Sequence, residues 1–499
     1  MKTPTALLRL VSAAAFAATS VAILAAAVAL PAAAQVDLTR IAWVGDSIGA
    51  GFSSGCLTKR VQVDSPSAVI ARTAGVADFQ QPIINDPGLG NCMVLTSLAP
   101  SFGAEAGNGT PANLSLPRPY NNLSIPGCAI GDMVRATTGA EASPGSCRSF
   151  IDLVLRNSAL HIGSPIAQAV ALNPTFVFLE NVGNDYLGAV LSGTVIDGVT
   201  VTPIAAFTAD INTALTTLKT KQPKGIVFGV VDVTSLPFAT TLPPYLTSGG
   251  KLVLVNGAPI PLLGPKFCAT GVPACAIPAN TIVTLNAAAY LPYGYGIPCA
   301  VAPTLPKCNN PLPAAAIDAS HPGALIYASD VAFLKQRGAD YNAAIKAAAT
   351  ASGYKYYDVN NFLLRLKAGF DFGGITINAA YLTGGAFSYD GFHLTPIGYA
   401  LVADDIIQFM NANFGAALPR VNLSTYLFNG GTNGGLSGSS ALYVPLNGED
   451  FERAVQGIFT PEFAAQLASM FSFPKPALVQ GDSGLVPRIE PHHRGVENP

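Results

Sequence analysis

Four short, mostly apolar runs, separated by helix-like segments, constrain the fold of this chain more than any other feature of its sequence. Runs of this length are typical of strands buried on both faces of a sheet. The alternation of such runs with helices predicts an α/β domain, in which helices cover a parallel sheet. The predicted strands are Ile41–Val44, Thr175–Leu179, Gly225–Val231 and Tyr354–Val359. The main predicted helices are 203–221, 329–351 and 396–413.

The first 34 residues have the layout of an export signal. Lys2 and Arg9 precede a long run of Ala, Val and Leu, which ends in small residues at 31–34. We therefore expect cleavage after Ala34 and a mature chain that is secreted or periplasmic, with cell-surface association left open. The run is also long enough for an uncleaved membrane anchor. Pro, Gly or polar residues interrupt every later apolar stretch, so no span is predicted in the mature chain.

The charge balance excludes some classes of partner. Only 11% of the 499 residues are charged, with 27 basic and 29 acidic side chains. Removal of the export signal takes away two of the basic residues and none of the acidic ones. A chain with this balance has no predicted nucleic-acid surface and no polybasic membrane patch.

All eight cysteines follow the export signal, and an even number in an exported chain indicates disulfides. No two cysteines have the spacing of a zinc knuckle, and the five histidines are too few to help build one, so no metal site is predicted. Short separations favour Cys268–Cys275 and Cys299–Cys308. Cys56–Cys92 and Cys128–Cys147 would then take the rest, although sequence alone does not fix this connectivity.

Two long regions depart from the alternation of strands and helices. Residues 52–119 are rich in Gly, Pro and Asn, and residues 233–328 are Pro-rich and apolar with four cysteines. Irregular segments of this length are uncommon unless they are functional or form a subdomain. We predict that 233–328 is a disulfide-stapled cap that lies over the carboxyl-end edge of the sheet and forms one wall of a substrate cleft.

The C-terminal part of the chain differs in composition from the α/β domain, which we place at 35–413. An appendage is expected at 414–476, containing a Gly/Ser/Asn-rich stretch at 429–440 and a helix at 449–471. Residues 477–499 have the composition of a disordered tail.

Three residues have the chemistry of nucleophilic catalysis. Ser47, in Gly45-Asp46-Ser47, directly follows the first predicted strand, and reactive groups gather at the carboxyl ends of parallel strands. A serine hydroxyl needs an adjacent base. Asp390 and His393 lie three residues apart before a predicted helix, a spacing that lets the carboxylate hold one ring nitrogen while the other faces the serine.

Together these motifs resemble the SGNH hydrolases, also called the GDSL family. Four blocks occur in the family's order: GDS at 45–47, NNLSIPG at 121–127, Asn184-Asp185, and the D-x-x-H of Asp390 and His393. The resemblance covers roughly 38–232 and 329–413. It implies a three-layer, flavodoxin-like fold with a parallel sheet, and a serine esterase or lipase that acts through an acyl-enzyme on Ser47. The implied partner is a small-molecule or lipid ester, and no cofactor is implied.

The same resemblance implies an oxyanion hole. Its donors would be the backbone N–H of Ser47, the backbone N–H of Gly127 and the side-chain amide of Asn184. Converging donors of this kind stabilise the negative oxygen of a tetrahedral intermediate. The family's third block usually reads G-x-N-D, whereas the glycine here, Gly183, directly precedes Asn184.

Each block also has an ordinary structural interpretation. The triplet Gly481-Asp482-Ser483 shows that GDS also arises in a polar tail, and a D-x-x-H can be a helix cap. The sequence 45–49 also satisfies the G-x-S-x-G pattern of α/β-hydrolases, but their elbow follows several strands and their acid does not normally lie three residues before the histidine. A non-catalytic surface or adhesion protein built on a hydrolase scaffold is a further alternative.

The expected substrate follows from the predicted cap. Its runs at 252–264 and 287–298 contain no charged residue. An apolar lid favours a lipid, acyl or aryl ester over a polysaccharide. Aromatic side chains there can also stack on sugars, so a carbohydrate deacetylase stays open.

Overall fold

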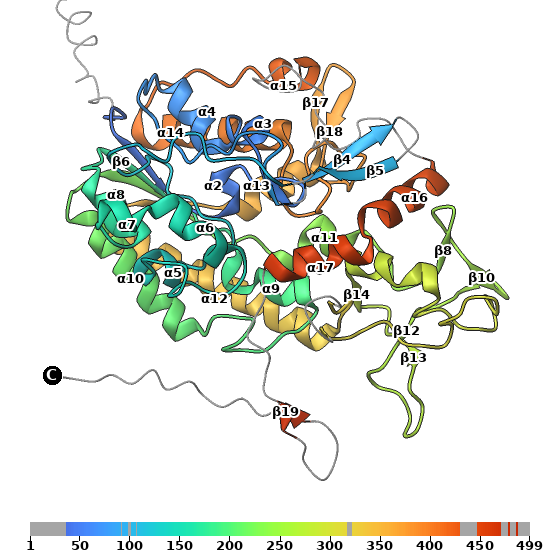
Figure 1. The fold of residues 1–499 in the computed structure, drawn as a ribbon. Helices are drawn as coiled ribbons and strands as arrows, with labels where there is room; N and C mark the ends of the chain where they lie inside the picture. The colour runs from blue at the N-terminus through green and yellow to red at the C-terminus, as the bar shows by residue number, and fades with distance from the viewer. Residues whose placement is uncertain are drawn as a thin grey trace, which may run out of the picture.

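A four-stranded parallel sheet lies at the centre of the protein, which is described here as a computed structural model (Figure 1). The strand order is β1-β6-β7-β16, and every pair of neighbours is parallel. These are the four strands predicted from the sequence. Their bounds are Ile41–Val44 for β1, Phe176–Leu179 for β6, Lys224–Phe228 for β7 and Lys355–Tyr357 for β16. The structure describes residues 36–90, 92–97, 101–105, 107–316, 322–429, 447–470, 478–479 and 486–487.

Three predicted segments lie outside the described residues. They are the export signal at 1–34, nearly all of the Gly/Ser/Asn-rich stretch at 429–440, and the tail at 477–499 except for the two-residue strands β19 and β20. These strands are Leu478–Val479 and Val486–Pro487. Within the described residues, none of the helices combines the length and the hydropathy needed to cross a membrane.

The chain between β1 and β6 extends the sheet beyond β1. Asn122 forms a parallel bridge to Trp43, and the Trp43 N–H donates to the Asn121 carbonyl at 2.8 Å. The Leu123 N–H donates to the Trp43 carbonyl and the Ile125 N–H to the Gly45 carbonyl. The segment that follows β1 in the chain therefore lies on one side of it, and β6 lies on the other.

Helices cover both faces of the sheet. Successive side chains of a strand point to opposite faces, and Tyr356 and Tyr357 show what each face contacts. The Tyr356 hydroxyl bonds Asn342 of α12 (Ala328–Ser352), which itself packs against α10 (Ile204–Lys219). The Tyr357 hydroxyl donates at 2.6 Å to Asp405 of α14 (Pro396–Phe414). The three helices predicted from the sequence are thus present, in an α/β arrangement of three layers.

The face toward α14 holds the aromatic part of the core. Trp43 stacks on Phe178 with ring centroids 4.3 Å apart, and Phe228 lies beside both. Burial of such large rings favours the packing of α14 onto the sheet. The remaining helices of the domain are α2 (Ser47–Ala50), α5 (Ile130–Arg135), α6 (Ser146–Leu155), α7 (Asn157–Leu160), α8 (Pro165–Ala171), α9 (Asn184–Ser192) and α13 (Val359–Ala368).

The first irregular region, 52–119, is partly built into the core. It contains α4 (Pro66–Thr73), which packs against α14 and buries most of its residues. The hydroxyl of Ser65 caps its first turn, but its eight residues are too few to produce a clear helical period, so the sequence did not predict it. The other elements are α3 (Lys59–Gln62), β2 (Cys56–Leu57), β3 (Leu89–Gly90), β4 (Cys92–Ser97) and β5 (Ser101–Glu105).

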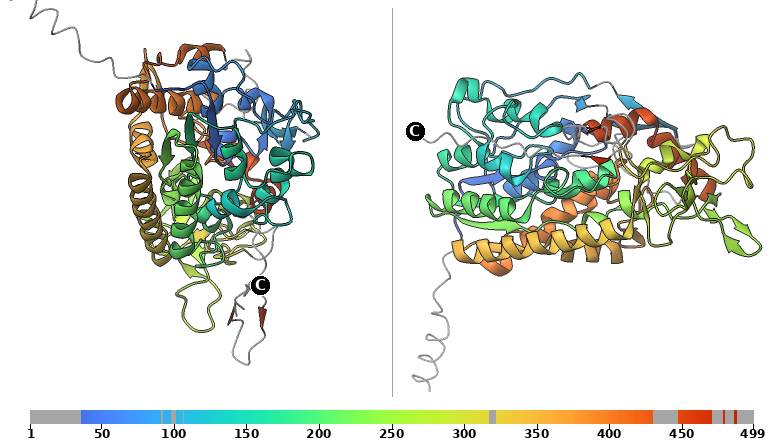
Figure 2. Two further views of the ribbon diagram at one scale, coloured as in Figure 1. Left: turned by 90° about the vertical axis from the view of Figure 1, so that its left-hand side faces the viewer. Right: turned by 90° about the horizontal axis from the view of Figure 1, so that it is seen from below.

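The second irregular region, 233–328, starts with the turns η1 (Val233–Ser235) and α11 (Pro237–Thr240) and then forms short hairpins. These hairpins project from one end of the molecule (Figures 1 and 2). A small separate core that includes Leu262, Tyr290 and Leu312 holds the region together. Its strands are β8 (Thr247–Ser248), β9 (Lys251–Leu252), β10 (Leu254–Val255), β11 (Ala258–Pro259), β12 (Leu263–Gly264), β13 (Cys275–Ala276), β14 (Ile282–Val283) and β15 (Leu325–Ile326). Two further turns are η2 (Leu285–Ala289) and η3 (Leu291–Tyr293).

The prediction of one continuous helix at 449–471 is wrong. Two helices, α16 (Gly448–Ile458) and α17 (Pro461–Met470), replace it. The break occurs because Pro461 has no N–H to continue α16, and the Thr460 hydroxyl accepts the Phe463 N–H at the start of α17. Phe459, at the break, packs against Phe238 and Tyr381.

The other described elements of the chain are short. They are β17 (Phe370–Phe372), β18 (Ile375–Ile377) and α15 (Ser424–Asn429). Disulfides join Cys56 to Cys92, Cys128 to Cys147, Cys268 to Cys275 and Cys299 to Cys308. These are the same four pairs that the sequence separations favoured.

Candidate active site

The candidate site lies at the carboxyl ends of β1 and β6. Ser47 begins α2 directly after β1, and Asn184 begins α9 directly after β6. Segment 121–125 pairs with one side of β1, and β6 pairs with the other side. The strand order of the sheet therefore changes direction at this point. In open α/β sheets such a point leaves a crevice where ligands bind.

The turn that carries Ser47 is fixed by two carboxyl groups. The Asp46 side chain accepts the Ile48 N–H at 2.9 Å and the Val182 N–H at 2.9 Å, which ties the turn to the residues after β6. Glu180 accepts the backbone N–H groups of Asp46 and Gly49 on one oxygen, at 3.1 and 3.0 Å. These bonds hold the backbone on both sides of Ser47.

The glycines of the GDSIG motif leave room for Glu180. A Cβ atom at Gly45 would lie 2.2 Å from its Oε2, and one at Gly49 would lie 2.7 Å away. Burial and the negative charge of Asp46 raise the pKa of Glu180 well above its ordinary value. Burial also raises the pKa of Asp46, although backbone N–H donors partly offset the effect. Both shifts have the same main cause, which is the burial of two neighbouring carboxyl groups beneath the turn.

Asp390 and His393 form a buried pair, as their spacing predicted. The His393 Nδ1 lies 2.8 Å from Asp390 Oδ2, and the two side chains are 2% and 0% exposed. Burial alone would raise the pKa of Asp390, but the facing His393 and hydrogen bonds from its ring and backbone more than offset this, so the pKa lies below its ordinary value. Asp390 is therefore a carboxylate that orients the imidazole.

The other ring nitrogen of His393, Nε2, is buried and makes no hydrogen bond to the described residues. Phe52 packs on the imidazole with ring centroids 4.8 Å apart. Ser47 and His393 line the same cavity, although no hydrogen bond joins them. Such bonds often tighten only when substrate is bound.

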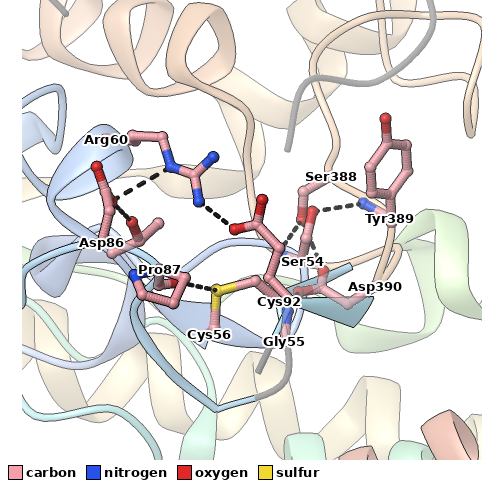
Figure 3. The surroundings of a disulfide bond; sticks show 12 residues. Ser54, Gly55, Cys56, Arg60, Asp86, Pro87, Cys92, Ser388, Tyr389 and Asp390 are labelled. Atoms are coloured by element: carbon pink, nitrogen blue, oxygen red, sulfur yellow. Dashed lines mark hydrogen bonds and ion pairs between the residues drawn. A yellow bond between two sulfur atoms is a disulfide. The ribbon is translucent and has the colours of Figure 1, made fainter. Parts of the chain in front are cut away.

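The first irregular region supports Asp390 directly (Figure 3). The Gly55 N–H donates to Asp390 Oδ2 at 3.1 Å, and the Ser388 hydroxyl donates to Asp390 Oδ1 at 3.1 Å. Ser54 donates its N–H to Ser388 at 2.9 Å and accepts the Tyr389 N–H at 3.2 Å. The disulfide of Cys56 follows immediately in the chain. The loop that carries the acid is thus bonded to a segment more than 300 residues earlier.

The three residues of the implied oxyanion hole lie in neighbouring segments. The Asn184 amide donates to the Cys128 carbonyl at 3.0 Å, next to Gly127. An amide nitrogen has two donors, so this bond orients the side chain and leaves one N–H for a ligand. Asn184 and Ser47 line the cavity, whereas Gly127 is not among its lining residues. The role of all three as oxyanion donors stays a prediction.

Asp185, the second residue of the Asn-Asp block, faces the interior. It accepts the Ile130 N–H at 3.1 Å and the Asn181 amide at 2.6 Å. Burial raises its pKa to about 6, against the pull of these donors. Asp185 thus joins α5 to α9 beneath the site.

The cavity beside Ser47 and His393 has a volume of about 90 Å³. Apart from Asp46, Glu180 and the candidate catalytic groups, it is lined almost wholly by apolar side chains. From 233–328, only Leu236 lines it within the described part of that region. Phe238 lies against Phe392, with its backbone N–H on the Gly391 carbonyl. The predicted cap therefore supplies far less of the cleft wall than we expected.

Within the described residues, one group of side chains has the geometry for a metal ion, namely Cys128, Asp132 and Cys147. The two sulfurs are joined in a disulfide, so neither is a thiolate that could bind a metal.

The sequence did not reveal Glu180, Phe52, Ser54 or Gly55 as parts of the site. Glu180 had one usable signal, since it is an acid placed directly after the fully apolar strand β6. The other three had none, because their contacts are with residues far away in the chain. Comparisons with protein-family models, with curated proteins and with solved structures found no match.

Proposed function

We propose that this protein is a serine ester hydrolase of the SGNH type, an esterase or lipase that cleaves carboxylic esters through an acyl-enzyme on Ser47. One observation carries the proposal. His393 is held by the buried carboxylate of Asp390 through Nδ1, while its unpartnered Nε2 and Ser47 border the same cavity. This is the arrangement that activates a serine hydroxyl.

The proposed reaction has two halves. The Ser47 Oγ attacks the ester carbonyl carbon while its proton passes to His393 Nε2, and Asp390 stabilises the imidazolium. The tetrahedral intermediate collapses, the C–O bond to the alcohol breaks, and His393 returns the proton to the leaving oxygen. Water then attacks the acyl-enzyme with His393 again as base, which releases the acid and restores Ser47.

Charge develops on the carbonyl oxygen in both halves of the reaction. The Ser47 N–H, the Gly127 N–H and the second N–H of Asn184 are the proposed donors to it. Removal of one such donor typically costs on the order of 10²–10³ in turnover. The buried, apolar surroundings strengthen each of these bonds relative to water.

The fold supports this assignment. With the segment 121–125 counted as the second strand, the order along the sheet is the flavodoxin-like 2-1-3-4-5. Ser47 follows β1, the first strand of the sheet in chain order, whereas the elbow of an α/β-hydrolase follows a later strand. We propose that the chain has the flavodoxin-like SGNH fold.

The apolar lining of the cavity favours a lipid, acyl or aryl ester over a carbohydrate ester. Sugar recognition needs several polar groups that match the hydroxyls, and the polar groups here are engaged with the backbone of the nucleophile turn. The four disulfides suit a secreted or periplasmic protein. A carbohydrate deacetylase and a non-catalytic surface protein are the alternatives.

The test is hydrolysis of p-nitrophenyl acetate by substituted proteins. Ser47→Ala and His393→Ala should each lower turnover by on the order of 10⁴-fold or more, and the double variant should be no worse, because triad members act as a unit. Ser483→Ala is the matched control, since Ser483 also follows Gly-Asp. If Ser47→Ala retained more than a few per cent of turnover, the proposal would be wrong. Wild-type protein without esterase activity would favour the non-catalytic alternative.

A further inference from the structure

The cavity beside Ser47 continues into the interior of the domain. Beyond the candidate catalytic groups, its walls come from one face of the sheet and from two helices packed on that face. The sheet contributes Trp43 and Phe228, α13 contributes Phe362 and Leu366, and α14 contributes Val402 and Ile406. All six side chains are buried and apolar.

The cavity is directed away from the catalytic groups. Ile406 lies ten residues beyond Pro396, the first residue of α14 after the His393 loop. At about 1.5 Å per residue this places it about 15 Å along the helix axis. The two acidic residues, Asp46 and Glu180, lie at the Ser47 end, where each accepts backbone N–H groups. Apart from the Tyr357 hydroxyl, which donates to Asp405, an entering group therefore meets polar side chains only near the reacting carbonyl.

We propose that this interior cavity binds the acyl chain of the ester and limits its length. The inference rests on the proposed function, because it takes Ser47 as the atom that is acylated. With the carbonyl at Ser47, the acyl chain would lie between the sheet and α13 and α14, and the alcohol would face the outside. The occupant must be uncharged and narrow, since the walls beyond the catalytic end offer no counter-charge, and the Tyr357 hydroxyl among them already donates to Asp405.

The volume of the cavity sets the expected chain length. A water-sized group needs ~10–15 Å³ in this measure, so about 90 Å³ holds on the order of six to nine such groups. A methylene group of a chain takes up about as much room as a water molecule, so the lower of these numbers predicts the best fit for an acyl chain of about six carbons. Longer chains would clash with Leu366 or Ile406, and shorter ones would leave the apolar space unfilled.

This location differs from the one expected from the sequence. Only Leu236 of the irregular region 233–328 borders the cavity in the described structure. The proposal therefore makes α13 and α14 the determinants of chain length, whereas the hairpins of 233–328 should have little influence on it.

The test compares turnover on p-nitrophenyl esters from acetate to palmitate. The wild-type kcat/KM should be highest near hexanoate and should fall for longer chains. Ile406→Phe narrows the cavity and should lower the hexanoate-to-acetate ratio of kcat/KM about tenfold, because a single methylene in an apolar pocket is worth 10-fold or more. Phe362→Ala widens it and should move the optimum toward longer chains. Ile345→Phe is the control, because Ile345 is equally buried on α12 but does not line the cavity.

The outcomes separate this inference from the proposed function. If acetate is hydrolysed and Ile406→Phe and Phe362→Ala leave the chain-length profile unchanged, the cavity is not the acyl site, although the esterase proposal stands. If no ester is hydrolysed by the wild-type protein, the proposed function itself fails. Should Ile406→Phe not fold, Phe362→Ala and the structure of a hexyl phosphonate adduct on Ser47 decide the question. A hexyl chain lying between α13 and α14 supports the inference, and one lying against 233–328 overturns it.

Discussion

The two irregular regions of this protein, 52–119 and 233–328, are similar in sequence and different in what they contact. Both are long, poor in periodicity and crossed by disulfides. The first packs α4 onto α14, bonds Asp390 through Gly55 and covers His393 with Phe52. The second adds Leu236, Phe238 and Leu285 to the main core, but its hairpins surround a small core of their own and project from one end of the molecule (Figure 1).

The amino-acid composition therefore identifies the irregular regions but does not show what each of them contacts. The sequence favoured 233–328 as the functional region, because it is the more apolar of the two and follows a strand whose end lies at the site. The structure instead connects 52–119 to the Asp390 carboxylate, through the backbone N–H of Gly55, and this bond needs no side chain at Gly55 and leaves no sequence signal. The region 233–328 reaches the same loop only at the Gly391 carbonyl, which accepts the Phe238 N–H.

The largest effect should come from removal of the Cys56–Cys92 disulfide by Cys56→Ala and Cys92→Ala together. The bond closes a loop of 36 residues, so its loss should cost about 4 kcal/mol of unfolding free energy. It also stiffens the segment beside Gly55, so kcat should fall by about tenfold with little change in KM, because the lost interaction orients the triad and does not bind substrate. Urea unfolding and esterase kinetics measure the two effects.

The control is removal of the Cys268–Cys275 disulfide in the other region. Its loop of seven residues predicts a smaller loss, about 2.5 kcal/mol, and kcat should stay within about twofold of the wild type. Equal losses of kcat in the two double variants would contradict a specific link between 52–119 and the triad.

Ser388→Ala tests the link between 52–119 and Asp390 at a single hydroxyl group. The substitution removes one donor to Asp390 and leaves the Ser54 N–H without its acceptor. We expect kcat to fall by about tenfold, because a bond to a charged group is worth ~1.5–3 kcal/mol and the other donors to Asp390 keep the loss at the lower end of that range. Ser149→Ala, which removes a hydroxyl bond to a backbone carbonyl in α6, should leave kcat unchanged. A change in KM without a change in kcat would show that Ser388 does not help to position the triad.

Asp185 provides a pH test in a part of the core that belongs to neither region. Its pKa in the folded protein is about 6, above the ordinary 3.8. The folded state therefore binds more protons than the unfolded state between these values, and stability falls as pH rises from about 4 to about 6, by about 3 kcal/mol. Asp185→Asn should flatten this slope in urea unfolding at several pH values, whereas the exposed Asp371→Asn should not. An unchanged slope would show that Asp185 is ionised throughout.

The sequence predicted the parts of the molecule whose signals are local. The apolar runs gave all four strands, and the D-x-x-H spacing gave the bonded pair Asp390 and His393. The small chain separations favoured the disulfides that the structure contains. The break between α16 and α17 also had a local signal in Pro461, which the prediction of one helix overlooked.

Other features depend on contacts between distant residues and could not be predicted. Glu180 lies under the nucleophile turn only because β1 and β6 pair in register. The role of Gly55 depends on the approach of two segments 335 residues apart. The interior cavity arises from the fit of α13 and α14 on the sheet, which no single segment specifies.

Covalent labelling of Ser47 by a fluorophosphonate tests the central claim most directly. Such a probe reacts with a serine only where a neighbouring base activates the hydroxyl, as Asp390 and His393 are proposed to do here. Mass spectrometry of the labelled peptides should find a single adduct on Ser47, absent in Ser47→Ala and formed far more slowly in His393→Ala. An adduct on another serine, or an unlabelled protein that is correctly folded, would contradict the account.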